Sequence, residues 1–371
     1  MRKKIIVSVA IIFALTCCFC SFGAQTRVAQ AESLCGEIVI ERDSGRILYS
    51  NNPHKKAYMA STTKIATAIT VIENCPLIDE EFVIPDCAVG VEGSSIYLQK
   101  GEKQTVRNLL YGLMLQSGND CAVALAIKVG ESVEKFAQMM NETARKVGAV
   151  NTNFTNPHGL HDDNHYTTAY DLALISAYAM KNPIFREIVS TKQTRINSPD
   201  GERVILNKNK ILSTFEGGNG VKTGFTKKAG RCLVSSATRN GMNVICVVLN
   251  CYEMFERSRN LLEKAFSEYE VVEILPVGEV CSAPVEGGKE NSVALSCTKS
   301  FSYPLKKEER ERVEIRVDGV ERMNAPVKKS TKNGKIQIFL DKQLLFFDNL
   351  FTIYNVESKN LWDKLKDLLQ N

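Results

Sequence analysis

The chain lacks the cysteine spacing of a zinc-binding protein and the strong positive charge of a nucleic-acid-binding protein. Three of its twelve cysteines fall within the first 31 residues, and none of the other nine makes a Cys-x-x-Cys step, so no sequence-spaced zinc site is predicted. We interpret most of these nine as small buried hydrophobic residues. The chain beyond residue 31 also has little excess of positive over negative charge. Residues 1–31 hold four basic residues and no acidic one, so without them the formal net charge falls from +5 to +1. No nucleic-acid-binding surface is predicted.

The N-terminal apolar run, over residues 5–19, is shorter than the ~20 residues that a membrane-spanning helix needs. It follows three basic residues at 2–4 and precedes the small-residue site Ala29-Gln30-Ala31, which is typical of a cleaved signal peptide. We therefore predict a signal peptide over residues 1–31 and an exported mature protein. A single-pass membrane anchor is the competing interpretation, and the short run disfavours it.

The pattern over residues 32–272 predicts a first domain of the α+β class. Residues 37–49 alternate and contain turn chemistry at Asp43-Ser44-Gly45, so the mature chain is expected to begin with a hairpin. Helical periodicity then predicts helices over the ranges 64–73, 109–114, 120–129, 133–147 and 169–180. Strands are expected again over the ranges 221–224, 232–237 and 242–249, before a helix around 261–266. The simplest assembly is an antiparallel sheet built from both ends of the domain, with the helical block inserted between them.

The rest of the chain differs in character. Residues 273–356 are rich in Gly, Pro and charge and alternate in strand-like runs at 313–317 and 335–340, which predicts a small β-rich domain. Residues 357–371 place five apolar residues on one helical face: Leu361, Trp362, Leu365, Leu368 and Leu369. This amphipathic tail helix can lie on a membrane surface or dock on the β-rich domain, and the sequence leaves both interpretations open.

Three short motifs, each weak alone, occur in one order along the chain: Ser61-Thr62-Thr63-Lys64, Ser117-Gly118-Asn119 and Lys222-Thr223-Gly224. A serine hydroxyl is a poor nucleophile until a base takes its proton, and Lys64 lies one helical turn beyond Ser61. Burial and the positive end of a helix dipole both favour the neutral amine that a base requires. We therefore predict Ser61 as nucleophile and Lys64 as its base, with the free Ser61 N–H as half of an oxyanion hole.

The second and third motifs supply polar groups to the same cleft. Ser117 lies in a tight loop between two helices and can relay a proton, while Asn119 can bond Lys64 or a substrate amide. Lys222 and Thr223, on a strand, offer a cation and a hydroxyl to a carboxylate, and Gly224 permits a close approach of substrate backbone. There is an alternative for each motif taken alone: Gly118 and Asn119 can be helix caps, and Lys222 can be a surface charge. The occurrence of all three motifs in this order favours the catalytic interpretation.

These motifs resemble the low-molecular-mass penicillin-binding proteins, the D-alanyl-D-alanine carboxypeptidases. The resemblance spans roughly residues 37–266, is less specific beyond them, and is carried by Ala60–Thr67, Ser117–Ala122, Asn156–Leu160, Thr168–Leu172 and Gly220–Gly230. It implies a serine β-lactamase/transpeptidase-like fold with a small C-terminal β domain. It also implies hydrolysis of the terminal D-Ala-D-Ala bond of a peptidoglycan stem pentapeptide, with β-lactams as covalent inhibitors. The enzyme would act at the outer face of the cytoplasmic membrane or in the cell wall.

The resemblance also implies roles for particular residues. Ser117 would be a catalytic partner, and Lys222 with Thr223 would hold the substrate carboxylate. The second oxyanion N–H would come from Phe225, where some family members carry histidine. Arg257 would help to bind the terminal carboxylate. No cofactor and no metal are implied.

Four other functions remain to be weighed. His158, His161 and His165 could suggest a metal, but their segment has a loop composition and the family assigns none there. A Ser-His-Asp triad is disfavoured because no Gly-x-Ser-x-Gly elbow surrounds Ser61. A β-lactamase would need a Glu-x-x-Leu-Asn run before Lys222, and none is present. A peptidoglycan-binding protein without catalysis is disfavoured by the intact motifs.

Overall fold

The structure is a computed structural model that describes residues 36–363. The predicted signal peptide lies outside the described residues, and so does the predicted tail helix from residue 364 onward. Within the described part of the chain, no helix is both long and apolar enough to cross a membrane.

The first domain is built on a five-stranded sheet in the order β2-β1-β9-β8-β7, with all neighbours antiparallel. Its strands are β1 (Gly36–Glu41), β2 (Ile47–Asn51), β7 (Gly218–Thr226), β8 (Gly230–Arg239) and β9 (Met242–Leu249). The predicted sheet from both ends of the domain is confirmed. Asn240 and Gly241 join β8 to β9 with φ of 47° and 79°, as the Asn-Gly signal for a tight hairpin turn requires.

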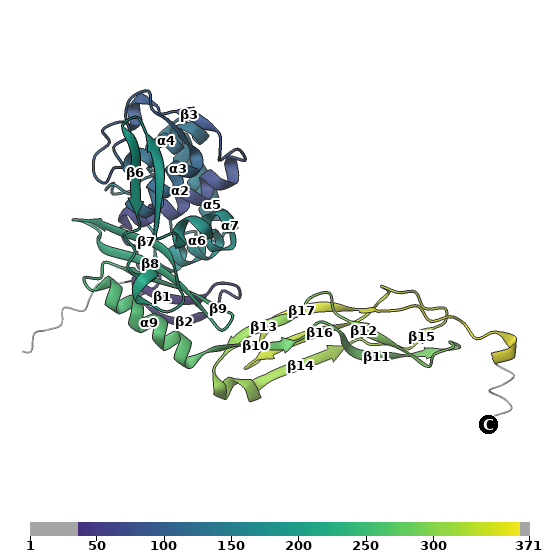
Figure 1. Cartoon of the computed structure of the whole chain (residues 1–371). Coiled ribbons are helices and arrows are strands. Elements are labelled where there is room, and N and C mark those ends of the chain that lie inside the picture. The colour runs from purple at the N-terminus through teal and green to yellow at the C-terminus, as the bar shows by residue number, and fades with distance from the viewer. Residues whose placement is uncertain (1–35, 364–371) are drawn as a thin grey trace, which may run out of the picture. The chain divides into compact units, whose positions relative to one another are not determined.

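The helical block inserted between β2 and β7 covers one face of this sheet (Figure 1). Its helices are η1 (Ala60–Thr63), α2 (Lys64–Asn74), η2 (Asp86–Ala88), α3 (Val106–Tyr111), the π-helical turn η3 (Gly112–Gln116), α4 (Asn119–Gly130), α5 (Val133–Lys146), α6 (Ala169–Lys181) and α7 (Pro183–Ser190). The short helix α8 (Ile211–Thr214) follows, and its Ile211 packs in the core on the other face of the sheet. Two small hairpins accompany them: β3 (Glu81–Val83) with β4 (Lys103–Thr105), and β5 (Gln193–Ser198) with β6 (Gly201–Leu206). The predicted helices are confirmed, whereas α7 and the β5–β6 hairpin were not predicted.

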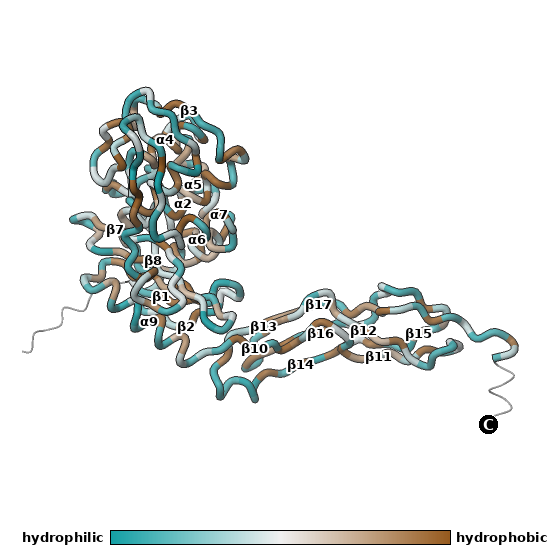
Figure 2. The backbone as a smooth tube through the Cα atoms, viewed as in Figure 1, coloured by the Kyte–Doolittle hydropathy of each residue, from teal (hydrophilic) through white to brown (hydrophobic). Residues whose placement is uncertain are grey.

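The sheet is buried on both faces. On β1, Ile38 and Ile40 pack into the core of the helical block, while Val39 faces the opposite side, where α9 (Met254–Glu268) lies. The apolar stretches of the chain accordingly run through the strands and the inner helices (Figure 2). The strand β7 is the edge of the sheet next to η1, so the nucleophile motif and the Lys-Thr-Gly motif lie side by side.

A β-rich region follows α9, which confirms the predicted C-terminal β domain. Six strands form a sheet in the order β14-β16-β17-β12-β11-β15, and β10 pairs separately with β13. The elements are β10 (Glu270–Leu275), β11 (Glu279–Glu286), β12 (Ser292–Ser296), β13 (Phe301–Leu305), η4 (Lys307–Arg312), β14 (Val313–Asp318), β15 (Met323–Asn324), β16 (Lys332–Leu340) and β17 (Gln343–Thr352). Ile336, Ile338 and Leu350 are fully buried in its core.

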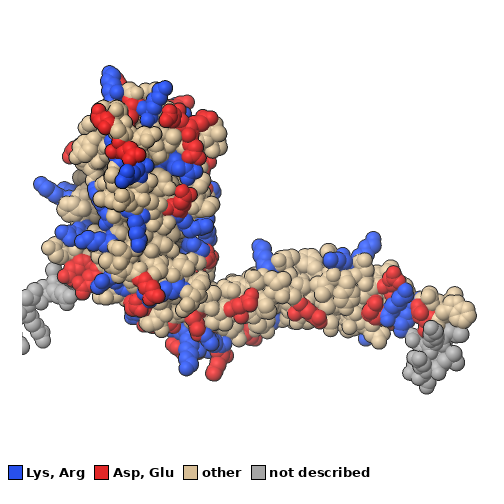
Figure 3. All heavy atoms as spheres, viewed as in Figure 1, with Lys and Arg blue, Asp and Glu red and all other residues tan. Residues whose placement is uncertain are grey.

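The surface and the cysteines agree with the composition. On the face shown in Figure 3, acidic and basic side chains are interspersed over much of the surface. Five of the described cysteines are buried and form no disulfide: Cys75, Cys121, Cys232, Cys246 and Cys297. They act as the small hydrophobic residues that the sequence predicts.

Candidate active site

The nucleophile motif forms a short 3-10 turn that runs directly into α2. Thr62 and Thr63 close this turn, because their hydroxyls donate to the carbonyl oxygens of Met59 and Ala60 at 2.6 and 2.8 Å. Lys64 is the first residue of α2 and is 0% exposed. This arrangement brings Lys64 Nζ to 3.2 Å from Ser61 Oγ, as the helical spacing predicts.

Lys64 Nζ has two further neighbours, and both can only accept hydrogen bonds. It donates to Asn119 Oδ1 and to the main-chain oxygen of His158, each at 2.7 Å. A neutral primary amine has two N–H groups and one lone pair. These two acceptors therefore use both N–H groups, and the lone pair remains for the Ser61 hydroxyl. The three contacts fit both the ammonium ion and this neutral amine, so the electrostatic surroundings decide which form is favoured.

The electrostatic surroundings favour the same protonation state. Burial is the main cause that holds the pKa of Lys64 well below its usual value, and the nearby positive charge of Lys222 lowers it further. The first turn of α2 also places the positive end of the helix dipole beside this amine. A lowered pKa makes the neutral amine, the form that can act as a general base, easier to reach.

Lys222 approaches from β7 and is 1% exposed. Burial lowers its pKa to about 7, and the charge of Lys208 contributes to the shift. Lys208, which the motifs did not indicate, donates from Nζ to the main-chain oxygen of Gln116 at 2.9 Å. Lys208 also lowers the pKa of Lys64. Three lysines thus create a positive potential in which an anion is favoured and a protonated Lys64 is not.

The Ser-Gly-Asn motif follows the π-helical turn. Ser117 ends that turn in the left-handed region, with φ of 68°, and is 5% exposed. Gly118 then precedes α4, so Asn119 enters the site from the first residue of that helix. Asn119 Nδ2 donates to the main-chain oxygen of Glu92 at 2.6 Å, which leaves Oδ1 directed at Lys64. Asn119 is therefore more than a helix cap.

Gly224 brings β7 close to the nucleophile turn. A Cβ at this position would lie 3.0 Å from Met59 O and Thr62 N and 3.1 Å from Ser61 N. Thr223, beside it, is half-buried, and Phe225 is 63% exposed. Because β7 is an edge strand, half of its main-chain N–H and C=O groups have no strand partner.

Arg257 is not brought to this cleft. Its guanidinium donates to both carboxylate oxygens of Glu37, at 2.8 and 2.7 Å, and to Tyr49 Oη at 2.9 Å. Glu37 is on β1, which β9 and β8 separate from β7. The ion pair with Glu37 raises the pKa of Arg257 above its usual value. The structure thus gives Arg257 a different carboxylate partner from the one that the resemblance implies.

The three clustered histidines serve separate contacts. His158 bonds Lys64 through its main-chain oxygen, His161 pairs with Asp163 at 3.3 Å, and His165 contacts Thr63. Among residues 36–363, no three His, Cys, Asp or Glu side chains form a group that could hold a metal. The main-chain role of His158 has no side-chain signature in the sequence, which is why it was not predicted.

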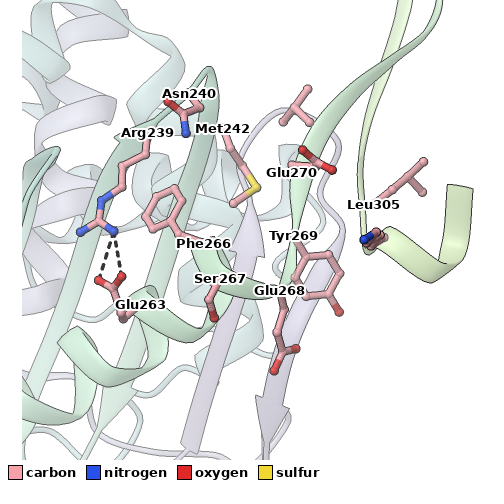
Figure 4. Close-up of a pocket in the computed structure, with 12 residues that line it drawn as sticks. Arg239, Asn240, Met242, Glu263, Phe266, Ser267, Glu268, Tyr269, Glu270 and Leu305 are labelled. Atoms are coloured by element: carbon pink, nitrogen blue, oxygen red, sulfur yellow. Dashed lines mark hydrogen bonds and ion pairs between the residues drawn. The ribbon is translucent and has the colours of Figure 1, made fainter.

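A pocket of about 530 Å³ lies elsewhere, at the C-terminal end of α9. Phe266 and Tyr269 contribute rings to it, and Arg239 is paired with Glu263 at its wall (Figure 4). None of its lining residues belongs to the three motifs. Arg239 in its wall is already paired with Glu263, and the pocket contains none of the residues predicted for catalysis.

The fold and the placement of Ser61 beside Lys64 are typical of serine peptidases that carry a serine and a lysine three positions apart. The chain belongs to the D-alanyl-D-alanine carboxypeptidase family, peptidase family S11, whose family model matches residues 24–253. The model of the C-terminal domain of penicillin-binding protein 5 matches residues 269–358. The family predicted from the motifs is confirmed.

Individual relatives agree with this assignment. The D-alanyl-D-alanine carboxypeptidase DacF of Bacillus subtilis is 31% identical over 318 residues, covering 83% of this chain and 82% of DacF. DacA of Haemophilus influenzae is 32% identical over 90% of this chain and 87% of its own. The crystal structure of penicillin-binding protein 5 from Haemophilus influenzae is 30% identical, with a TM-score of 0.72 over 87% of this chain and 97% of that structure. These matches span both the helical and the β-rich regions.

Proposed function

We propose that this chain is a serine-type D-Ala-D-Ala carboxypeptidase that removes the terminal D-alanine from peptidoglycan stem peptides. The observation that carries the proposal is the set of partners around Lys64 Nζ. Two acceptors occupy its N–H groups and the Ser61 hydroxyl lies 3.2 Å away, so the amine is arranged to receive a proton from Ser61.

Acylation follows from this geometry. Lys64 takes the hydroxyl proton while Ser61 Oγ forms a bond to the carbonyl carbon of the penultimate D-alanine. The main-chain N–H groups of Ser61 and Phe225 stabilise the negative oxygen of the tetrahedral intermediate. The C–N bond then breaks, and the proton reaches the leaving amine by way of Ser117. Water attacks the resulting ester while Lys64 accepts its proton. The bond between Ser61 Oγ and the acyl carbon then breaks, Lys64 returns the proton to Ser61 Oγ, and the shortened peptide leaves as a carboxylate.

The terminal carboxylate of the substrate is assigned to Lys222 and Thr223. A bound carboxylate raises the pKa of Lys222 back above neutrality, so the ammonium form is restored by the substrate itself. Lys208 adds to the positive potential of this site. A β-lactam places its own carboxylate on the same groups and acylates Ser61, which accounts for its action as a covalent inhibitor.

We place the enzyme outside the cytoplasmic membrane, since its substrate is cell-wall peptide and residues 1–31 have the pattern of a signal peptide. The predicted tail helix over 357–371 is proposed to rest on the outer surface of the cytoplasmic membrane. Leu361 and Trp362 support this, because they are 82% and 75% exposed and thus available to the interfacial region of a bilayer.

Release of D-alanine from a synthetic stem pentapeptide tests the proposed function. The mature protein should release it, and Ser61→Ala should not. A labelled penicillin should modify the protein at Ser61, as shown by mass mapping. Modification without release of D-alanine would indicate a penicillin-binding protein of other specificity, and the absence of both would overturn the proposal.

A further inference from the structure

A loop over residues 155–165 packs tightly on the nucleophile turn. A Cβ on Gly159 would lie 1.9 Å from Ala60 O and 2.8 Å from Thr63 Oγ1. Thr67, on α2, donates to the main-chain oxygen of Pro157 at 2.6 Å. The position of Ser61 therefore depends on where this loop lies.

The turn itself needs such support. Ala60, the residue before the nucleophile, has φ of 48°, in the left-handed region that costs an alanine about 1 kcal/mol. A residue in this region persists when its surroundings over-determine it, and such residues concentrate at functional sites. The contacts from the loop are the surroundings that hold Ala60 here.

His165 is the buried titratable group at the centre of these contacts, and the proposed mechanism does not use it. It is 3% exposed, and its Nδ1 lies 3.1 Å from the main-chain nitrogen of Thr155, which can only donate. Nδ1 must therefore accept, and the ring proton of the neutral imidazole lies on Nε2. Nε2 is 2.7 Å from Thr63 Oγ1, and that hydroxyl donates its own proton to Ala60 O. The donor and acceptor of each of these three hydrogen bonds are therefore determined.

The groups that face His165 keep it neutral. Burial lowers its pKa to about 4, Lys64 and His161 lower it further, and Asp162 acts in the opposite direction. His158, from the same loop, is also held neutral, with a pKa of about 3. A second ring proton on His165 would also oppose the Thr155 N–H, donor against donor.

We propose that His165 is a positioning residue of the active site: its Nε2–H bonds Thr63 Oγ1 and so fixes the turn that presents Ser61 to Lys64. The inference rests on the proposed function, because it concerns the rate at which Ser61 is acylated. It assigns no direct contact between His165 and the substrate.

The test is the acylation of Ser61 by a fluorescent penicillin, measured with the apparent affinity and the melting temperature. His165→Asn keeps an acceptor for Thr155 but cannot reach Thr63, and Thr63→Val removes the hydroxyl. Each should lower the maximal acylation rate roughly tenfold to a hundredfold with little change in apparent affinity, as expected for a misplaced nucleophile. The double variant should be no slower than Thr63→Val, since that change already removes the contact with His165, together with the bond to Ala60 O.

Two further variants control the interpretation. His165→Gln places an amide donor near the Nε2 position and should recover much of the rate. His161→Ala changes a histidine of the same loop that pairs with Asp163 rather than with the turn, and should acylate at the wild-type rate. A wild-type rate in Thr63→Val, or additive losses in the double variant, would overturn the proposal. If His165→Asn does not fold, Thr63→Val and His165→Gln decide the question.

The tautomer gives a readout that does not need activity. Nitrogen-15 spectra of the wild-type protein at pH 7 should show His165 protonated at Nε2 and bare at Nδ1. The opposite tautomer, or a charged ring, would overturn the proposal. A wild-type protein that neither reacts with penicillin nor releases D-alanine would overturn the proposed function, and this spectrum would then decide the His165 contact by itself.

Discussion

Gly224 and Ser61 are in such close contact that the strand carrying one fixes the position of the other. A Cβ on Gly224 would approach three main-chain atoms of the nucleophile turn at 3.0 to 3.1 Å, Ser61 N among them. These neighbours are main-chain atoms that cannot rotate away as a side chain can. Packing against the nucleophile turn thus requires a glycine at this position of the Lys-Thr-Gly motif, in addition to the access that a glycine gives to substrate.

Gly224→Ala should slow acylation about tenfold while the fold persists, because β7 must move a few tenths of an ångström away from the turn. Rate constants for penicillin acylation and thermal unfolding measure the two effects. Gly36→Ala is the matched control: it lies on β1 of the same sheet, and its added Cβ would meet neighbours only at ordinary distances of 3.4 and 3.5 Å. Equal acylation rates in the two variants would contradict the prediction.

The pH dependence of turnover should be bell-shaped, with a different lysine on each limb. As pH rises through the lowered pKa of Lys64, the base becomes neutral and kcat/KM increases. As pH passes the pKa of Lys222, about 7, the free enzyme loses the cation that binds the substrate carboxylate and kcat/KM declines. The alkaline limb should therefore be mainly an increase in KM.

Lys222→Arg separates these two limbs. A guanidinium stays charged throughout this range, so the alkaline decline should move out of the measured range, while the acid limb of Lys64 should stay. An unchanged alkaline limb in Lys222→Arg would show that another group controls it. Steady-state kinetics with the stem pentapeptide from pH 5 to about 10 suffice.

The fold and the core of the site were predictable because their signals are local. The all-round apolar run after Lys64 predicts a buried helix, Asn240-Gly241 predicts a tight hairpin, and the three motifs lie at junctions between elements. The hairpin β5–β6 was missed although Pro199-Asp200-Gly201 gives it a turn. Its exposed, charged strands lack the apolar alternation on which the strand predictions relied.

Other parts of the site could not be predicted because they depend on contacts between distant segments. His158 acts through a main-chain oxygen, which no residue type reveals. Lys208 matters because its charge reaches Lys222 and Lys64 across the fold. The partner of Arg257 is Glu37, 220 positions away in the chain, and only the sheet order shows that β1 carries it away from the cleft.

Acidification should destabilise the protein through His158 and His165. Their pKa values, about 3 and about 4, lie below the usual 6.5, so the unfolded state binds more protons as pH falls from about 6.5. The contribution of the two histidines to stability is therefore fully present above about pH 6.5 and is lost as pH falls toward their folded-state pKa values. Lys64 acts in the same direction at higher pH. The loss from His165 alone is on the order of 3 kcal/mol when complete.

Urea unfolding at several pH values between 4 and 8 measures this effect. His165→Gln should reduce the slope of unfolding free energy against pH, because its amide does not titrate. An equal slope in His165→Gln and in the wild-type protein would show that the acid sensitivity arises elsewhere.

Arg257 should matter for stability and not for substrate binding. Its removal leaves Glu37, which is 3% exposed, as a buried carboxylate without its cation. Because the Arg257 side chain is 38% exposed, solvent screens part of the interaction, and we expect Arg257→Met to cost about 2 kcal/mol. The combined Glu37→Gln, Arg257→Met variant should recover part of that loss, since no unpaired charge remains. KM for the stem pentapeptide should be unchanged in both, in contrast to Lys222→Met, which should raise it. A higher KM in Arg257→Met at unchanged stability would return Arg257 to the carboxylate-binding role that the family resemblance implies.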